Sequence, residues 1–189
     1  MITVRGLAKR YGDRRVLRDL DLDVPDGGFL LVTGPNGSGK TTLLRILAGL
    51  VAPSAGEVAL PPRKTIGYLG HNPLVYRELT ALENLTLFAR LYRVPAEDVG
   101  MLLERFGLWD VRHDRVATFS RGMQQRLGLC RVLLHAPTLL VLDEPANALD
   151  AAGLVLLQEV LAEEQRTFVV ATHEPQHVES LATSRLALA

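Results

Sequence analysis

The chain has 189 residues, and its 21 lysines and arginines balance 21 aspartates and glutamates, so its formal net charge is zero. The length is enough for one sizeable core, and the balanced charge argues against a strongly basic nucleic-acid-binding surface. The single cysteine, Cys130, excludes an internal disulfide framework, and a cytosolic protein is the simplest explanation.

The N-terminal part of the chain shows three predicted strands before its first helix. The N-terminus lacks the apolar core of a signal peptide, and residues 2–7 predict a short strand that closes at Tyr11. Apolar and acidic residues alternate over 20–24, which predicts a strand with one face in water. The apolar stretch 29–33 predicts a buried strand, and the helix after the loop that follows is expected to end near Gly49.

The middle of the chain is predicted to be mostly helical. Residues 51–64 are rich in proline and glycine, which predicts a loop-rich connector with room for one short strand at 57–60. A strand is predicted at 65–69. Apolar residues recur at helical spacing from 78 to 107, with an interruption at Pro95. No run of 18 apolar residues occurs, so we expect no membrane-spanning helix.

The last third alternates helices with two strongly apolar strands. Ser120 precedes a predicted helix whose apolar face includes Cys130, which we expect to be buried rather than to act as a nucleophile. Continuous apolar runs at 138–142 and 167–171 predict strands buried on both faces. The remaining predicted elements are a helix at 154–161, a last helix around Leu181 and a final strand at 186–188. This alternation predicts an α/β fold with a parallel sheet, and the helical stretch at approximately 75–135 is long enough to form an inserted subdomain.

The most specific motif lies between the strand at 29–33 and the helix after it. Residues 34–41 match the phosphate-binding pattern G-x-x-x-x-G-K-[ST], in the context of strand, glycine-rich loop and helix that the pattern requires. Glycines allow successive backbone N–H groups to face one anion, and the helix N-terminus adds positive potential. Lys40 can reach the outer phosphates, and the Thr41 hydroxyl can bind Mg²⁺. The motif and the residue after it are Gly34, Pro35, Asn36, Gly37, Ser38, Gly39, Lys40, Thr41 and Thr42.

A pair of carboxylates follows the apolar run at 138–142. Asp143, at the end of that strand, can help Thr41 to hold Mg²⁺. Glu144 comes next, and although adjacent residues of a strand point to opposite faces, the chain turns here, so both carboxylates can face the phosphates. A second carboxylate beside a metal-bound phosphate suits a base that activates water. Taken alone, the pair is equally well explained by an Asp-Glu-Pro turn that ends a strand.

These motifs and others, in the same order, resemble the ATP-binding cassette (ABC) ATPases over nearly the whole chain. Tyr11 resembles the aromatic residue that stacks on adenine, with Val16 nearby, and such stacking is typically worth about 1–3 kcal/mol per base. Residues 34–42 resemble the Walker A loop. Residues 139–144 resemble Walker B, which makes Glu144 the general base.

Three later segments complete the resemblance. The segment that starts at Ser120 resembles the family's signature, in which Ser120 and Gly122 approach the ATP of the opposite subunit. Asp150 ends a segment that resembles the D-loop, and His173 resembles the switch histidine that contacts the γ-phosphate. The resemblance therefore implies a homodimer that forms head to tail on ATP binding and encloses two ATP molecules, with Mg²⁺ as the second cofactor.

The resemblance also implies an architecture and a cellular setting. Over residues 1–189 it implies a single ABC ATPase domain, which is a P-loop NTPase of ABC type with a mostly parallel sheet, a small antiparallel β part and an inserted helical subdomain. It implies ATP hydrolysis with Glu144, His173 and Lys40 as the catalytic residues. The implied partners are integral membrane permease subunits and not nucleic acid. The implied location is the cytoplasm, peripheral on the inner face of the cell membrane.

The chain departs from the family pattern at three places. In the signature, Arg121 and Met123 replace a glycine and a glutamine. The glutamine of the Q-loop is absent, and His71 stands at its position with Asn72 beside it. We favour His71 as the residue that reaches Mg²⁺ or the attacking water, with Asn72 as the alternative. The connector at 51–64 is short, so we expect a trimmed antiparallel part.

Part of the chain is similar to one group of exporters. Residues 69–73 followed by 79–85 look like the ATPase subunit of the haem exporter of cytochrome c biogenesis, and related exporters share parts of this match. Other functions stay open: the ATPase of an exporter of drugs, lipids or polysaccharides, a soluble ABC protein that acts on DNA or ribosomes, or a module that has lost catalysis. The balanced charge and the lack of a long coiled-coil insertion argue against the soluble class.

Overall fold

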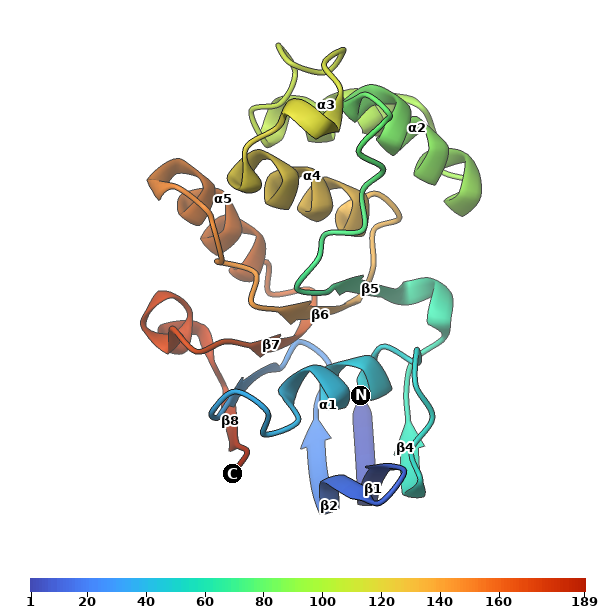
Figure 1. The fold of residues 1–189 in the computed structure, drawn as a ribbon, viewed down its shortest axis with the longest axis vertical. Helices are drawn as coiled ribbons and strands as arrows, with labels where there is room; N and C mark the ends of the chain where they lie inside the picture. Colours follow the sequence, from blue (N-terminus) through green and yellow to red (C-terminus); the bar gives the residue numbers. More distant parts are fainter.

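The centre of the molecule is a parallel β-sheet. The computed structural model describes residues 1–189, and its larger sheet has five strands in the order β5-β6-β7-β3-β8, each parallel to its neighbours. These strands are β3 (Phe29–Thr33), β5 (Ile66–Leu69), β6 (Leu139–Asp143), β7 (Thr167–Ala171) and β8 (Ser184–Ala187). Parallel sheets are normally covered on both faces, and here helices lie on either side of the sheet (Figure 1).

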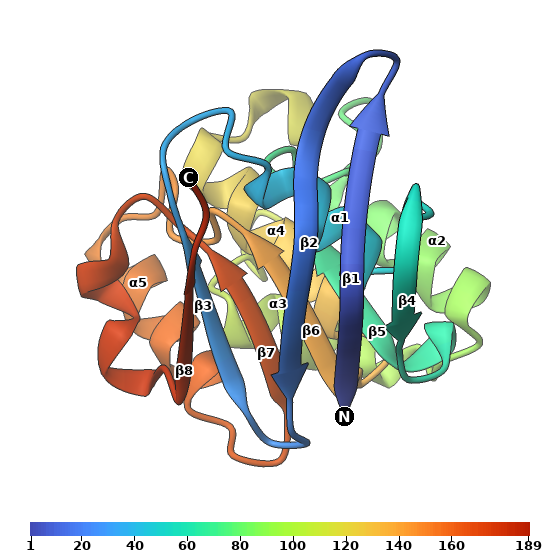
Figure 2. The same cartoon turned by 90° about the horizontal axis from the view of Figure 1, so that it is seen from below.

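A second, antiparallel sheet lies in front of the parallel one in Figure 2. Its strands, in the order β2-β1-β4, are β1 (Ile2–Tyr11), β2 (Arg14–Val24) and β4 (Ala55–Ala59). The first two strands are longer than predicted, because a hairpin that turns at Gly12 pairs Tyr11 with Arg14. Backbone pairing rather than an apolar pattern holds this extension, since its side chains are mostly charged and exposed.

Helix α1 (Lys40–Leu47) lies between the two sheets. Its apolar side chains share one core with residues of β1, β3 and β6. This packing holds the start of the helix at the edge of the sheet where β3 ends. The buried apolar residues of α1 are Leu43, Leu44, Ile46 and Leu47.

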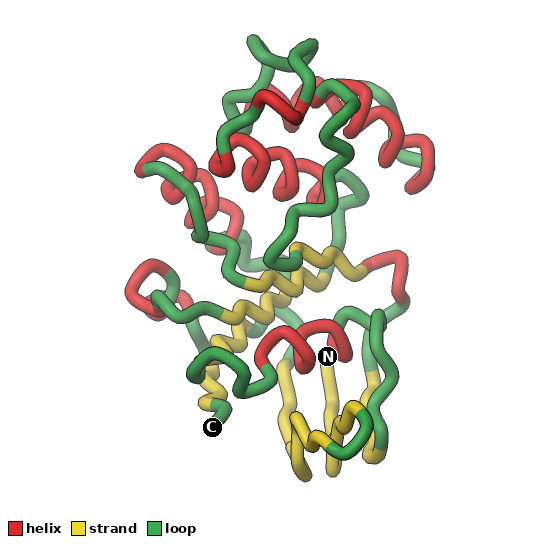
Figure 3. Tube along the Cα trace, in the orientation of Figure 1, coloured by secondary structure: helices red, strands yellow, loops and turns green.

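Three helices are inserted between β5 and β6 and form the far end of the molecule (Figure 3). They are α2 (Ala81–Tyr92), α3 (Glu97–Arg105) and α4 (Arg121–Leu133). Helix α2 begins with a capping box, in which the side chains of Thr80 and Glu83 each bond the other residue's backbone N–H. The fully buried side chain of Asn84 bonds both backbone groups of Tyr76 and so fixes the loop that enters the helix. A second core joins these helices to α5 (Ala151–Leu161) and to the other face of the sheet.

Strand β6 contributes to both cores. Leu139 and Val141 belong to the core around α1, whereas Leu140 and Leu142 belong to the core under the inserted helices. Every residue of the strand is buried, which explains why its apolar pattern is continuous rather than alternating. Because β3 and β6 are both parallel to β7, which lies between them, the residues after Asp143 emerge at the same edge as the loop after β3.

The predicted α/β fold is confirmed, including the small antiparallel part and the inserted helices. One predicted element is wrong: the chain around Leu181 forms two short 3₁₀ turns, Pro175–His177 and Glu179–Leu181, instead of a helix. Within these turns and the residue between them, only Val178 is buried, so there is no apolar face to stabilise a longer helix. None of the helices combines the length and the hydropathy that crossing a membrane requires.

Candidate active site

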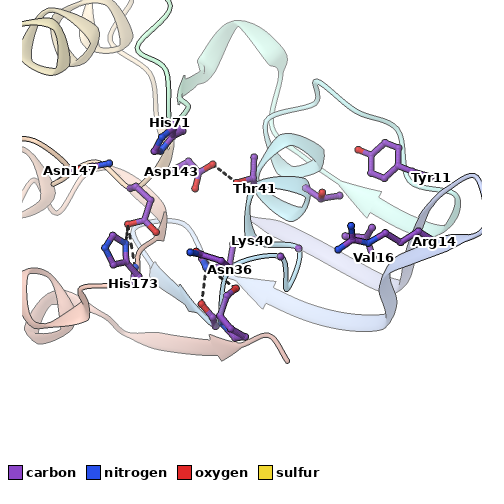
Figure 4. A pocket seen from close by; sticks show the side chains of 16 residues that line it. Tyr11, Arg14, Val16, Asn36, Lys40, Thr41, His71, Asp143, Asn147 and His173 are labelled. Atoms are coloured by element: carbon purple, nitrogen blue, oxygen red, sulfur yellow. Dashed lines mark hydrogen bonds and ion pairs between the residues drawn. The ribbon is translucent and has the colours of Figure 1, made fainter. Parts of the chain in front are cut away.

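The phosphate-binding pattern forms the loop between β3 and α1. Three of its glycines, Gly34, Gly37 and Gly39, have φ values of 145°, 86° and 103°, which other residues rarely adopt. At Gly39 a side chain would also be obstructed, because a Cβ there would lie 2.9 Å from Leu17. Backbone of this kind can present successive N–H groups to an anion, and α1 begins directly after it (Figure 4).

Lys40 and Thr41 begin α1 and face the space in front of the loop. The buried Lys40 ammonium donates hydrogen bonds to the carbonyl oxygens of Gly34, at 2.7 Å, and Pro35, at 3.2 Å. The Thr41 hydroxyl donates to Oδ2 of Asp143 at 2.7 Å. The first turn of α1 therefore brings a cation and a hydroxyl to the carboxylate at the end of β6.

Asp143 is buried at the end of β6, and its surroundings disfavour its charge. Burial raises the pKa of the Asp143 carboxyl group, and the neighbouring charge of Glu144 also raises it. The Thr41 hydrogen bond and the charges of His71 and Lys40 act in the opposite direction without cancelling the rise. A cation beside Asp143 would stabilise its ionised form.

Glu144 faces the same space as Asp143 because its backbone adopts a left-handed conformation, with a φ of 53°. Its Oε2 accepts a hydrogen bond from the backbone N–H of His173 at 3.2 Å and lies 2.8 Å from Nδ1 of the His173 ring. The Glu144 side chain is 13% exposed, whereas that of His173 is 58% exposed. Glu144 is thus held in place while the histidine ring remains accessible.

Most of the predicted nucleotide-binding and catalytic residues line one cavity of about 690 Å³. Small-molecule sites typically measure roughly 300–1,000 Å³. Tyr11 and Val16 lie toward one end, and His71 and His173 toward the other, with the phosphate loop between them (Figure 4). The predicted residues that line the cavity are Tyr11, Val16, Gly34, Pro35, Asn36, Gly37, Gly39, Lys40, Thr41, Thr42, His71, Asp143, Glu144 and His173.

Four predicted residues do not line this cavity. Ser38 belongs to the loop, but its hydroxyl is buried without a hydrogen-bond partner. Ser120 caps α4 and Asp150 caps α5, each by accepting a hydrogen bond from the backbone N–H three residues later, at 3.2 Å and 2.9 Å. Gly122 lies against the carbonyl oxygen of Ala148. Within one chain, Ser120, Gly122 and Asp150 therefore contact the protein backbone outside the cavity.

Of the two candidates for the missing glutamine, His71 lines the cavity and Asn72 does not. Asn72 lines a smaller adjacent cavity of about 310 Å³, together with Arg121 and Gln124. His71 lines both cavities. A molecule bound against the phosphate loop would therefore meet His71 first.

Two residues of the cavity, Arg14 and Asn147, were not predicted. Arg14 pairs with Tyr11 across the tip of the β1–β2 hairpin, so the two side chains emerge on the same face. Its Nη2 lies 3.8 Å from the position that a Cβ on Gly37 would occupy. The sequence does contain a sign of this pairing, because only two residues separate Tyr11 from Arg14, which is the spacing of a tight hairpin. No sequence pattern singles out Asn147.

We expect Arg14→Ala to weaken ATP binding by about two- to fivefold, because an exposed ionic contact is worth up to about 1 kcal/mol. Binding of adenosine, which has no phosphates, should change less. Calorimetric titration with both ligands measures the difference. Arg15→Ala is the matched control, since Arg15 is also exposed but does not line this cavity. Equal losses in the two variants would contradict a local role for Arg14.

The oxygen atoms of Thr41 and Asp143 fit a magnesium ion better than the imidazole of His71 does. Mg²⁺ prefers oxygen ligands and usually combines one or two carboxylates with waters and substrate phosphates, whereas imidazole suits transition metals. No three or more His, Cys, Asp and Glu side chains are grouped so that they could hold a metal ion. A magnesium ion here would therefore depend on oxygens of a bound nucleotide.

The fold and this cavity together define a P-loop nucleotide-binding protein. A family model described as ABC transporter matches residues 17–147. Because this match covers more than half of the chain, the chain belongs to the ABC transporter family. It carries the ABC ATPase domain, which is the part of that family that binds and hydrolyses ATP.

Individual proteins that are similar to this chain are ABC ATP-binding proteins too. The chain is 39% identical over 196 residues to the uncharacterized ABC transporter ATP-binding protein YdbJ of Bacillus subtilis (strain 168), and the match covers 96% of this chain but 64% of YdbJ. It is 34% identical over 192 residues to the lantibiotic transport ATP-binding protein SrtF of Streptococcus pyogenes, and this match covers 96% of this chain and 84% of SrtF. The solved dimer of an ATP-binding cassette in a post-hydrolysis state, bound to ADP and Pi, superposes with a TM-score of 0.88 at 26% identity and covers 100% of this chain and 94% of that one.

Proposed function

We propose that this chain is the ATP-hydrolysing subunit of an exporter, and that it dimerises on ATP binding to drive a separate membrane permease. The observation that carries this proposal is the single cavity in which the phosphate loop, Asp143, Glu144 and His173 surround space for one nucleotide. Membership of the ABC transporter family and the similarity to SrtF support a role in transport.

ATP would bind along the cavity from Tyr11 to His173. The Tyr11 ring is exposed and offers a face for adenine, while the N–H groups of the loop and the α1 N-terminus offer donors for the phosphates. Lys40 would exchange its hydrogen bonds to Gly34 and Pro35 for bonds to the outer phosphate oxygens. The oxygen pair of Thr41 and Asp143 would hold Mg²⁺, which neutralises charge on the phosphate oxygens.

Glu144 would act as the base for the attacking water. Its Oε2 is held by His173, which leaves Oε1 to accept the proton as the water oxygen attacks the γ-phosphorus and ADP leaves. Because Nδ1 of His173 donates to Glu144, Nε2 carries a proton and can donate to the γ-phosphate only in the imidazolium form of the ring. His71 lies on the same cavity and would orient the water in place of the missing glutamine.

The signature residues support a site shared between two chains. Ser120 and Arg121 are exposed at the start of α4, and Ser120 and Gly122 do not reach the cavity of their own chain. A second copy arranged head to tail would place its α4 N-terminus opposite the phosphates, where a helix dipole favours an anion. The similar cassette solved as a dimer supports this arrangement.

If the site is shared, the ATPase rate per chain should rise with protein concentration until the dimer is saturated. Steady-state phosphate release over a concentration series measures this. A sharper form mixes two variants, Lys40→Ala and Ser120→Arg, each of which should be nearly inactive alone. In a mixed dimer one site combines the intact Lys40 of one chain with the intact Ser120 of the other, so activity should partly return. A constant rate per chain together with no recovery on mixing would contradict the shared site.

The permease would dock on the inserted helices. Helix α2 and the loop before it are drawn in green in Figure 1. Large apolar side chains are exposed in this region, residues 70–95. A short amphipathic helix of a permease could cover them, and this contact would hold the chain on the inner, cytoplasmic face of the cell membrane. The exposed residues are Leu74, Tyr76, Leu91 and Tyr92.

Haem export for cytochrome c assembly is a more specific candidate that rests on residues 69–73 and 79–85. These segments flank the loop that enters α2, so they lie beside the proposed docking surface. The name of SrtF indicates a different cargo for that relative. Genes for a permease and for cytochrome c assembly beside this gene would favour haem export, whereas genes for peptide or drug export would contradict it.

A further inference from the structure

The turn after β6, residues 144–149, is strained at its first residue. We call this segment the Glu144 turn. A φ of 53° is unusual for a residue other than glycine, and such conformations persist only where surrounding contacts hold them. From the sheet side, the Glu144 N–H donates to the carbonyl of Ala171 in β7 at 2.8 Å. Within the turn, the Asn147 N–H donates to the Glu144 carbonyl at 3.1 Å.

Gln125 holds the Glu144 turn from the opposite side. It lies in the second turn of α4, the residue is 5% exposed, and its Nε2 donates to the carbonyl of Pro145 at 3.2 Å. Three residues earlier, α4 meets the turn again at Gly122, where a Cβ would lie 2.7 Å from the Ala148 carbonyl oxygen. Both contacts depend on residue type, since one needs a buried donor and the other needs a glycine.

We propose that Gln125 is a positioning residue for Glu144, which keeps the carboxylate facing the cavity and passes displacements of α4 to it. This inference rests on the proposed role of Glu144 as the general base. Without the Gln125 donor, the buried Pro145 carbonyl loses its partner, and the strained backbone of Glu144 can relax. A misplacement of about 1 Å can lower a rate by about 100-fold, so a small relaxation would be visible in turnover.

Gln125→Met removes the donor and keeps the size of the side chain. It should lower kcat by about 10- to 100-fold while KM and the Kd for ATP change less than about twofold, because no contact with the nucleotide is lost. Gln158→Met is the matched control: Gln158 is exposed on α5, and its Nε2 also donates to a backbone carbonyl, that of His177, at 3.1 Å. This control should keep the wild-type kcat. A kcat for Gln125→Met within about twofold of wild type, or a parallel loss of ATP binding, would overturn the proposal.

A double-variant comparison separates positioning from a general loss of structure. If Gln125 acts through Glu144, adding Gln125→Met to Glu144→Gln should not lower the residual rate further, whereas a general structural defect would lower it by the same factor in both backgrounds.

The two single variants also distinguish a failure of the proposed function from a failure of the positioning role of Gln125. Full turnover in Glu144→Gln would refute the proposed function, but loss there with normal turnover in Gln125→Met would refute the positioning role alone.

Gln125→Glu serves if the methionine variant does not fold. A buried glutamic acid is favoured in its neutral form, in which its O–H can donate to the Pro145 carbonyl in place of the amide. The kcat of this variant, divided by that of wild type at the same pH, should therefore rise as the pH falls. The division removes any pH dependence that the two proteins share. A ratio that does not change with pH would contradict the proposal.

Discussion

Glu144→Gln is expected to keep ATP binding and to lose turnover by about 10²–10⁴-fold, the usual contribution of a general base. The amide has nearly the size of the carboxylate, and its oxygen can still accept the hydrogen bond from the His173 N–H. It cannot, however, take a proton from water. Single-turnover hydrolysis measures the chemical step, and calorimetric titration measures ATP binding separately.

Glu159→Gln provides the control for this variant. Glu159 is exposed on α5 and does not line the cavity, so removing its charge tests the substitution without touching the site. This variant should retain the wild-type rate. Glu144→Gln with unchanged hydrolysis would exclude Glu144 as the base, and a large loss of ATP affinity would show that the carboxylate acts in binding instead.

The positions of the phosphate loop and of Asp143 could be predicted because both follow from local sequence. Glycines, a lysine and a threonine at fixed spacing define the loop, and a continuous apolar run marks β6 as a strand buried on both faces. The carboxyl ends of parallel strands lie at one edge of the sheet, so both motifs are expected at that edge, where β7 separates β3 from β6.

The orientation of Glu144 could not be derived in the same way. Local geometry left open whether Glu144 would face the cavity or the opposite side. In the structure Glu144 has a left-handed backbone and bonds Ala171, and the next residue, Pro145, bonds Gln125, and both of these partners are distant in sequence. Arg14 was missed for a related reason, since its place in the cavity follows from pairing with Tyr11 in a hairpin of charged residues. Single hydrogen bonds and pairings of this kind do not produce a periodic pattern in the sequence.

Asp143→Asn is expected to lower turnover by about 10²–10³-fold, the range found when one group that stabilises transition-state charge is removed. An asparagine oxygen can still accept the hydrogen bond from Thr41, so the fold of the site should be kept. Its neutral amide would bind Mg²⁺ poorly, so the variant should need far more Mg²⁺ to reach its remaining rate. A magnesium titration of the ATPase rate measures both effects, and Asp110→Asn, at an exposed position outside the cavity, is the control.

The same substitution should make the protein more stable at neutral pH. The pKa of Asp143 is raised in the folded chain, mainly by burial, so the ionised carboxylate is less favourable in the folded state than in the unfolded one. This cost is present above the folded pKa and disappears below the unfolded pKa, where the group is protonated in both states. Asp143→Asn removes the charge, so its Tm should exceed that of wild type at neutral pH, by about 2–4 °C for each kcal/mol in a chain of this size. The difference should shrink as the pH falls. A lower Tm at neutral pH would mean that the charge stabilises the fold, whereas a higher Tm with lost turnover would show that Asp143 is retained for catalysis at the expense of stability.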